Sequence, residues 1–269
     1  MPQPLPIALT IAGSDSGGGA GIQADLKTFA ALGAHGTSVL TCVTAQNPLH
    51  VLGVHPCSTA IVRRQLEAVF QEVPPAAIKT GMLYSDAVIR NIAAFLRLRG
   101  GPPLVVDPVM VSTSGACLLK ASAVETLVNR LLPLATLITP NLLEAELLTG
   151  QRLRTVEDLR RAARTLHQRF RCAALVKGGH LRGLKEAADI FYDGKEELLL
   201  TAPFLAGMRT HGTGCTYSAA ITASLAHGLP LSQAVQRAKR YITQAIARSR
   251  AIAGYTVLDF VAAAAGVGA

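Results

Sequence analysis

The chain has 269 residues, half of them hydrophobic, which is enough to bury a large core in one α/β domain. Its 26 Lys and Arg against 17 Asp and Glu give a formal charge of +9, which favours anionic partners such as nucleotides. The basic residues are not interleaved with aromatic residues, so a nucleic-acid-binding surface with stacked bases is not expected.

The five scattered cysteines predict neither a disulfide framework nor a zinc site, and they fit a reducing compartment. The N-terminal segment MPQPLPIALTIAG lacks the basic start and long apolar run of a signal peptide. No apolar stretch reaches the length that spans a membrane. We therefore expect a cytoplasmic protein with no membrane partner.

Short apolar runs alternate with segments of helical periodicity along the chain. Strands are predicted at residues 7–12, 37–44, 77–79, 104–106, 137–139 and 173–177. Helices are predicted at residues 19–32, 60–72, 86–99, 121–132, 143–149, from 155 onward, 216–227 and 231–253. Asp193-Gly194, between apolar runs at 188–192 and 197–201, predicts one late β-hairpin.

This alternation predicts an α/β fold with a mostly parallel central sheet and helices on both faces. We expect a single domain over residues 1–269, with a flexible Ala/Gly-rich tail at 261–269. Sheets of this kind bind ligands beyond the carboxyl ends of their strands, so the segments that follow the strands are the candidate sites.

The first strand leads into a glycine-rich segment at residues 13–21. It is not a phosphate loop of the GxxxxGK[ST] type, because no lysine follows its last glycine before Lys27. Residues 19–24 fit a relaxed dinucleotide fingerprint, but the acid expected about 20 residues later is missing, since Glu67 is the next acid after Asp25. A nicotinamide enzyme is therefore disfavoured.

Two carboxylates have both a functional and a structural interpretation. Asp25 borders the core-facing stripe of the first helix, where it could accept a hydrogen bond from a ligand or simply be stabilised by the helix N-terminus. Asp107 follows a buried strand and precedes Pro108, so it could hold Mg²⁺ through water or act as a cap.

Two further strand ends carry polar groups. Asn141 and Glu144 share one face if a helix begins near Asn141, and the same spacing is typical of an N-cap with an acid at the third helical position. Lys177 ends a strand beside Gly178-Gly179, where it could neutralise a phosphate or lie in solvent.

The segment Thr210 to Thr216, THGTGCT, opens a helix of small residues. Gly212 and Gly214 free the backbone, and the helix N-terminus then directs several amides at one point, which suits the charge on a transferring phosphoryl group. The helix dipole is expected to lower the thiol pKa of Cys215, which could then accept a proton. A buried, inert thiol is the alternative.

Taken together, these segments resemble the hydroxymethylpyrimidine/phosphomethylpyrimidine kinase family of thiamine biosynthesis, within the ribokinase-like superfamily. The resemblance covers about residues 7–250. It rests on AGSDSGGGAGIQADLKT, Gln46-Asn47, KTGML from Lys79, DPVM from Asp107, TPNLLEAELLTG, LVKGGH and HGTGCT.

The resemblance implies transfer of the ATP γ-phosphate, with Mg²⁺, to hydroxymethylpyrimidine and then to its monophosphate. The family's pattern assigns the pyrimidine to Gly13, Asp25, Gln46, Met82 and Val109, the metal to Asp107 and Glu144, the triphosphate to Asn141, Lys177 and Thr213, and the chemistry to Gly212, Thr213, Gly214 and Cys215.

Related kinases with a similar HGTGC segment act on pyridoxal, sometimes alongside the pyrimidine, so a pyridoxal kinase or a dual kinase is the alternative. Gln46 favours the pyrimidine. Superfamily relatives are often dimers, which makes a homodimer the expectation. After Gly254 the chain departs from the family's glycine-bearing C-terminal pattern.

Overall fold

The structure is a computed structural model that describes residues 4–110, 119, 121–179, 181, 186–204 and 211–266. Within these residues the main sheet has nine strands in the order β3-β2-β1-β4-β5-β6-β7-β8-β9. The strands are β1 (Ile7–Asp15), β2 (His35–Gln46), β3 (Val51–Pro56), β4 (Ala77–Thr80), β5 (Leu104–Val106), β6 (Leu137–Ile138), β7 (Ala173–Lys177), β8 (Glu186–Tyr192) and β9 (Glu197–Pro203).

The middle of the sheet, from β2 through β7, is parallel. Its two margins are antiparallel, with β3 paired to β2 at one side and the β8–β9 hairpin at the other. The strand that follows β1 in the chain, β2, lies on one side of β1, whereas β4 lies on its other side. The direction in which the chain adds strands to the sheet therefore reverses between β1 and β4. Ligands of open α/β sheets bind beyond the strand ends at such a reversal.

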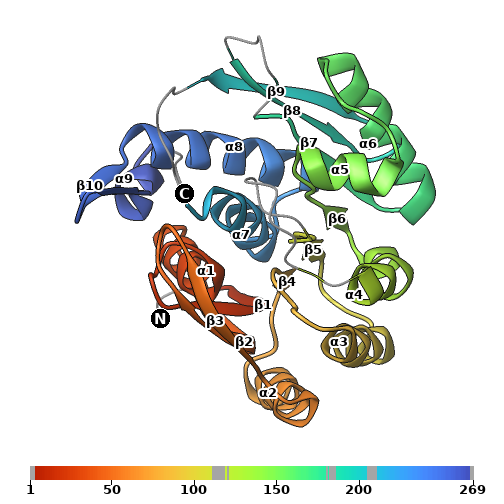
Figure 1. Cartoon of the computed structure of the whole chain (residues 1–269), viewed down its shortest axis with the longest axis vertical. Helices are drawn as coiled ribbons and strands as arrows, with labels where there is room; N and C mark the ends of the chain where they lie inside the picture. Colours follow the sequence, from red (N-terminus) through yellow and green to blue (C-terminus); the bar gives the residue numbers. More distant parts are fainter. Residues whose placement is uncertain are drawn as a thin grey trace.

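Helices cover both faces of this sheet (Figure 1). One face carries α1 (Gly21–Ala31), α7 (Thr213–Ala226), α8 (Leu231–Ala247) and α9 (Phe260–Ala264). The other carries α2 (Thr59–Glu72), α3 (Asp86–Arg99), α4 (Ala121–Thr126), α5 (Leu142–Thr149) and α6 (Val156–Phe170). After α4 the chain continues as the π-helical turn η1 (Leu127–Leu131) and the 3-10 turn η2 (Leu132–Leu134), where the sequence predicts one regular helix.

Successive side chains of the central strands enter opposite cores. Val105 and Leu137 pack under α7 and α8, whereas Val106 and Ile138 pack under the α2 to α6 layer. This explains why the strands are continuous apolar runs with no polar alternation, as parallel strands buried on both faces are. The predicted fold class is confirmed, including the late hairpin.

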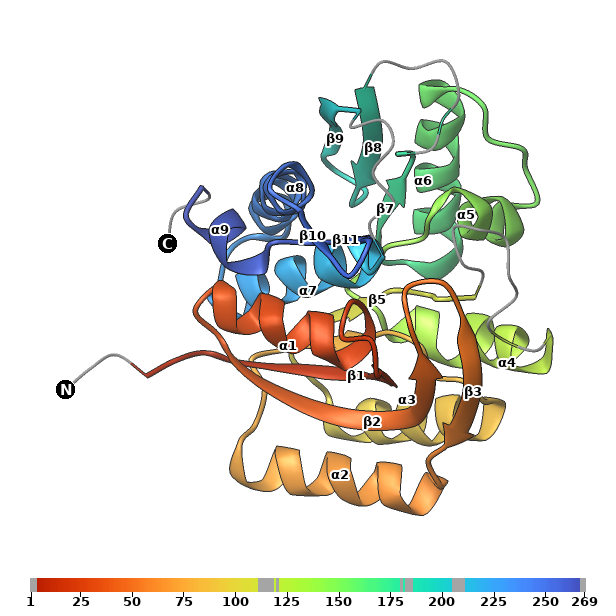
Figure 2. The ribbon, with the colours of Figure 1, turned by 60° about the vertical axis from the view of Figure 1, so that its left-hand side comes forward.

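Four elements were not predicted, namely β3, α9, β10 (Arg250–Ile252) and β11 (Tyr255–Val257). The strand β3 forms a hairpin with β2, seen as a long ribbon in Figure 2. The predicted helix at 231–253 ends at Ala247, and the small hairpin of β10 and β11 follows. The prediction of a flexible tail from residue 261 is wrong at its start, because α9 is packed with Ala263 fully buried.

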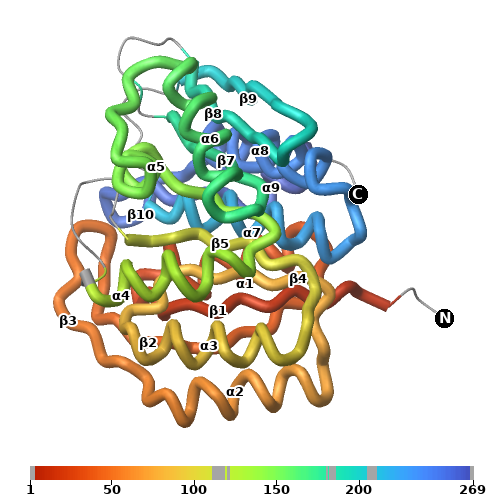
Figure 3. The backbone as a smooth tube through the Cα atoms, turned by 90° about the vertical axis from the view of Figure 1, so that its right-hand side faces the viewer, coloured from red at the N-terminus to blue at the C-terminus, as the bar shows by residue number. Residues whose placement is uncertain are grey.

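The chain termini lie on the same side of the molecule (Figure 3). No helix within the described ranges is long and apolar enough to cross a membrane.

Candidate active site

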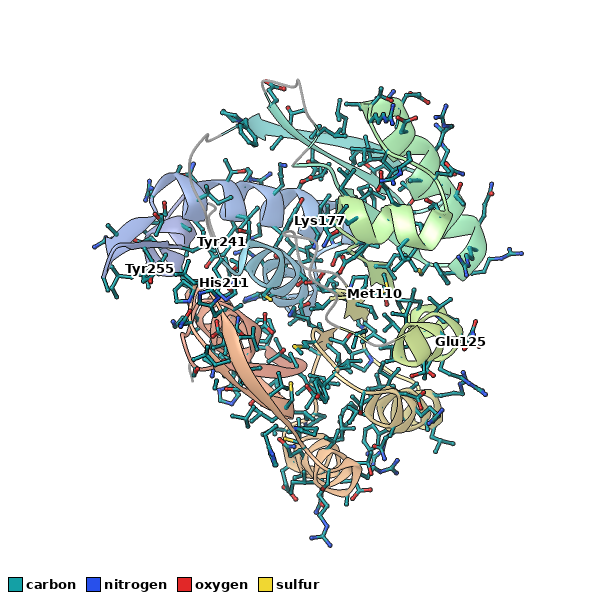
Figure 4. All side chains as sticks on the ribbon, viewed as in Figure 1. Met110, Glu125, Lys177, His211, Tyr241 and Tyr255 are labelled. Atoms are coloured by element: carbon teal, nitrogen blue, oxygen red, sulfur yellow. The ribbon has the colours of Figure 1, made fainter. Side chains whose placement is uncertain are left out.

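The polar residues at the ends of β5, β6 and β7 converge on the start of α7. Asn141, after β6, forms a bridge with Lys177 at the end of β7. A Cβ on Gly214 would lie 3.3 Å from Lys177 Nζ and 3.7 Å from Asp107 Oδ2. The helix N-terminus therefore faces both the ammonium and the carboxylate, and Figure 4 labels Lys177 beside this helix.

Lys177 and Asp107 form a largely buried ion pair, with Nζ 3.1 Å from Asp107 Oδ1. The hydroxyls of Thr139 and Ser218 also lie against this carboxylate, at 3.3 and 3.4 Å. Burial acts to lower the pKa of Lys177, but the carboxylates of Asp107 and Glu144 outweigh it and the net shift is upward. The lysine is thus charged and held at a strand end, so the interpretation of Lys177 as a solvated side chain is wrong.

Glu144 lies in the first turn of α5 and takes part in the N-terminal cap of that helix. Its Oε2 accepts the Asn141 N–H while Asn141 accepts the Glu144 N–H, which is the capping box that the spacing allowed. Its other oxygen accepts the Met110 N–H at 2.9 Å. Burial and the neighbouring Asp107 raise the pKa of Glu144 to about 7, although Lys177 opposes the shift. The structural interpretation is confirmed, and it leaves a carboxylate in an environment short of positive charge.

This donor set fits a magnesium ion that is only partly held by protein. Asp107 and Glu144 are both buried, and burial and the charge of Asp107 raise the pKa of Glu144, a shift that a further cation beside the two carboxylates would offset. Among the residues the structure describes, no three His, Cys, Asp or Glu side chains cluster as a metal site. Mg²⁺ commonly takes one or two carboxylates and completes its shell with water and substrate phosphates.

The start of α7 is shaped by Gly212, which has a φ of +84° in the left-handed region that glycine adopts freely. A Cβ there would lie 1.8 Å from the Gly19 carbonyl oxygen, so only glycine fits between the two loops. The helix begins at Thr213, three residues earlier than predicted, and Gly212 supplies no side-chain cap. The first amides of a helix have no partner within the helix, and at Gly214 this end of α7 lies beside Lys177.

Cys215, in the first turn of α7, is half-buried. The expectation that the helix dipole lowers its pKa is wrong, since burial raises the pKa of this thiol to about 11. The ammonium of Lys79 acts to lower it, while the charges of Asp25 and Asp107 add to the rise. Two carboxylates and a low-dielectric environment therefore outweigh the dipole.

Asp25 lies in a buried ion pair beneath the sheet reversal. Its Oδ2 accepts from Lys79 Nζ at 2.8 Å and from the Thr10 hydroxyl at 2.6 Å, and the two charged side chains are 0% exposed. Burial raises the pKa of Asp25, although Lys79 opposes this. The helix N-terminus is not its main partner, so that interpretation is wrong. Asp25 Oδ1 has no hydrogen-bond partner among the described residues.

The other candidates for ring binding fall on three segments. Gly13 lies against Met82, because a Cβ on Gly13 would be 3.9 Å from the Met82 Cβ and 2.7 Å from Cys42 Sγ. Gln46, at the end of β2, lies beside His211. Val109 follows Asp107-Pro108 with a φ of +46°, a strained conformation for a β-branched residue.

Comparison with known proteins decides the family. A family model described as phosphomethylpyrimidine kinase matches residues 15–257. The chain belongs to the phosphomethylpyrimidine kinase family. This confirms the resemblance that the motifs indicated.

The hydroxymethylpyrimidine/phosphomethylpyrimidine kinase of Rhizobium meliloti is 52% identical over 89% of this chain and 90% of its own length. A thiamine biosynthesis bifunctional protein of Geobacter sulfurreducens is 51% identical over 91% of this chain, which spans 50% of that protein. Among solved structures, an ADP complex of Bacillus subtilis pyridoxal kinase has a TM-score of 0.88 and 37% identity, over 96% of this chain and 98% of that one.

Four residues of this phosphomethylpyrimidine kinase family member escaped the sequence analysis: Lys79, Ser218, Asp15 and His211. Lys79 carried a usable signal, because a charge inside a short, buried strand requires a partner. Asp15 carried another, since an aspartate before three glycines often binds its own loop, and here it accepts the N–H groups of Gly17 and Ala20.

Proposed function

We propose that this protein transfers the γ-phosphate of ATP, with Mg²⁺, to hydroxymethylpyrimidine and then to the monophosphate of that alcohol. One observation carries the proposal: the start of α7, where Gly212 provides no side-chain cap, faces a buried Lys177–Asp107 pair, with Glu144 beside it. Donors, a cation and paired carboxylates at one point are what phosphoryl transfer requires, since its catalysis is mostly positioning and charge stabilisation.

Different groups would contact the phosphates in different roles. The amides of Gly212, Thr213 and Gly214 would stabilise the charge on the transferring group, and Lys177 would pair with phosphate oxygens. Asn141 would contact the triphosphate from the start of α5. Mg²⁺, held through Asp107 and Glu144, would neutralise the β- and γ-phosphate charge.

The ring side would be formed by Gly13, Asp25, Gln46, Met82 and Val109. A carboxylate and a carboxamide complement the donors and acceptors of an aminopyrimidine. The unpartnered Oδ1 of Asp25 supports this assignment, because a buried acceptor without a donor is costly until a ligand supplies one. Met82 and Val109 would pack on the ring faces.

Cys215 is the proposed acceptor of the hydroxymethyl proton. Because its pKa is about 11, the free enzyme holds most of it as a thiol, which cannot accept a proton, so the acceptor would be the thiolate fraction, which grows as the pH rises. The proton of the hydroxymethyl oxygen would pass to this thiolate as the oxygen bonds to phosphorus, and because phosphoryl transfer depends mostly on positioning and charge stabilisation, a small thiolate fraction would suffice. The nearby Lys79 ammonium, which favours the thiolate, supports a role in the transition state.

The test is an ATP-consumption assay with hydroxymethylpyrimidine, its monophosphate and pyridoxal side by side, with and without Mg²⁺. We expect turnover of both pyrimidines, none without Mg²⁺, and lower kcat/KM for pyridoxal. Faster turnover of pyridoxal than of hydroxymethylpyrimidine would overturn the assignment.

A pyridoxal kinase is the second candidate, favoured by the closeness of the fold to the Bacillus subtilis enzyme. The higher identity to the Rhizobium meliloti protein, 52% against 37%, supports the pyrimidine. A homodimer in the cytoplasm stays a prediction, to be checked by sedimentation and fractionation.

A further inference from the structure

His211 lies where three segments of the chain meet. Its Nε2 is 3.0 Å from Asp15 Oδ2, at the end of β1, and 3.0 Å from the carboxamide of Gln46, at the end of β2. His211 itself comes directly before Gly212 and α7. One imidazole nitrogen therefore contacts both Asp15 of the glycine-rich segment and Gln46, a residue proposed to bind the pyrimidine ring.

Asp15 settles where the proton of this imidazole lies. The carboxylate is 2% exposed, and it accepts N–H groups from Gly17, at 2.8 Å, and Ala20, at 2.8 Å. Burial acts to raise the pKa of Asp15, but the contacts with His211 and these amides outweigh it and lower the pKa. An ionised carboxylate only accepts, so His211 Nε2 must carry a hydrogen.

That hydrogen decides which way the Gln46 carboxamide points. With its nitrogen toward His211 and its oxygen 3.1 Å from Thr44 Oγ1, Gln46 would need a lone pair on His211 Nε2, and the same lone pair would oppose Asp15. The Thr44 hydroxyl would also have to donate to Gln46, although it lies 2.7 Å from the Ser14 carbonyl oxygen. Turning the amide by 180° removes both conflicts, because its oxygen then shares the single His211 Nε2 hydrogen with Asp15 Oδ2 in a three-centre hydrogen bond, and its nitrogen donates to Thr44.

We propose that His211, held by Asp15, is a positioning residue that fixes the orientation of the Gln46 carboxamide and thereby selects the aminopyrimidine edge of the substrate. The inference rests on the proposed function, in which Gln46 meets the ring. With one lone pair bound to His211 and one N–H bound to Thr44, the amide presents one acceptor and one donor in a fixed order. An exocyclic amine beside a ring nitrogen presents the complementary order.

A ring that carries a hydroxyl in place of the amine depends less on this order, because a hydroxyl donates or accepts as its hydrogen rotates. Holding the amide in one orientation therefore favours the aminopyrimidine, which can pair with only that orientation, over a hydroxyl-bearing ring, which can pair with either. His211 would thus set selectivity among vitamin-precursor alcohols without touching them.

The imidazole is also held by shape. A Cβ on Gly19 would lie 2.9 Å from His211 Cδ2, so the ring packs against the bare backbone of the loop. A phenylalanine at 211 can retain this packing while lacking the N–H. A glutamine at 211 can place an N–H close to the Nε2 position. These two substitutions separate hydrogen bonding from packing.

The experiment measures binding of hydroxymethylpyrimidine and of ATP by calorimetry for His211→Phe, His211→Gln and the control His35→Phe, which changes an exposed histidine. For His211→Phe we expect pyrimidine affinity to fall roughly 10- to 100-fold, the worth of a misdirected buried hydrogen bond, with less than about threefold change for ATP. His211→Gln should recover most of the affinity, and His35→Phe should match the unaltered protein. Equal losses for both ligands, or no recovery with glutamine, would overturn the inference.

A double-mutant cycle with Gln46→Leu tests whether His211 acts on pyrimidine binding through Gln46. If His211 acts through Gln46, adding His211→Phe to Gln46→Leu should change pyrimidine affinity by less than about twofold. Additive losses would overturn this inference while leaving the proposed function in place. Pyrimidine binding that Gln46→Leu does not weaken would instead count against the ring contact, and so against the proposed function itself.

Discussion

Replacing Lys79 with methionine is expected to lower the free energy of unfolding by about 3–5 kcal/mol at pH 7, the usual cost of removing one partner from a buried ion pair. Methionine fills most of the lysine volume but leaves the Asp25 carboxylate with only the Thr10 hydroxyl, in a position that is 0% exposed. Because domains are stable by about 5–15 kcal/mol, the loss should be large on the scale of the whole fold.

The same variant should respond to pH with a defined sign. Burial already raises the pKa of Asp25, and Lys79 is the main group opposing that rise. Without Lys79 the folded protein holds a proton that the unfolded chain releases near pH 4, so stability should fall as pH increases, by up to about 1.4 kcal/mol per pH unit. The fall continues until the folded-state pKa is passed.

Urea unfolding at pH 5, 7 and 8.5 measures both effects. The control is Asp25→Asn combined with Lys79→Met, which removes the two charges together and should recover much of the loss and abolish its pH dependence. A loss below about 1 kcal/mol for Lys79→Met, or a double variant less stable than the single one, would refute the account of a buried charge requiring its partner.

Four further predictions concern the site. Cys215→Ala should still bind both substrates and lose about 10²–10⁴-fold in turnover, the worth of a positioned base. Since the pKa of Cys215 is about 11, the rate at which its thiol is alkylated and the turnover of the unaltered protein should both rise as the pH increases from 7 to 9. A turnover that does not change with pH would exclude the thiolate as the proton acceptor. Asp107→Asn should raise the Mg²⁺ concentration needed for half-maximal rate, and an unchanged metal titration would remove Asp107 from that role. Lys177→Ala should raise KM for ATP well above any change for the pyrimidine, and a normal ATP response would assign the lysine to structure alone.

Much of the fold was predictable because local signals agree with it. The helix at Asp86–Arg99 was predicted to the residue, since Ser85 caps it and Gly100 follows it. The strand β3 was missed because it is an edge strand that contains Gly53 and ends at Pro56, so its exposed residues show no strand pattern. It becomes a strand only by pairing with β2.

The site residues, like the elements of the fold, were predictable where the signal was local and were missed where it depended on contacts between distant parts of the chain. Polar residues after β5, β6 and β7 were found because parallel strands end at one edge, whatever the details of packing. The Asp25–Lys79 pair joins residues 54 positions apart, and no local pattern specifies such a contact. The thiol pKa of Cys215 was mispredicted for a related reason, because a helix dipole is a local property while burial and the charge of Asp25 come from the tertiary fold.

The order of the layers has a consequence for how the protein is made. On one face of the sheet only α1 comes from the first part of the chain, between β1 and β2, whereas α7, α8 and α9 come from the last third. While the ribosome is still translating that last third, the emerged strands present apolar residues such as Val105, Leu137 and Leu175 with no helix to cover them. Nascent chains that expose such surface are prone to aggregate. Synthesis of this protein therefore includes an interval in which the sheet needs protection, and the interval closes only when the helix that completes the active site has been translated.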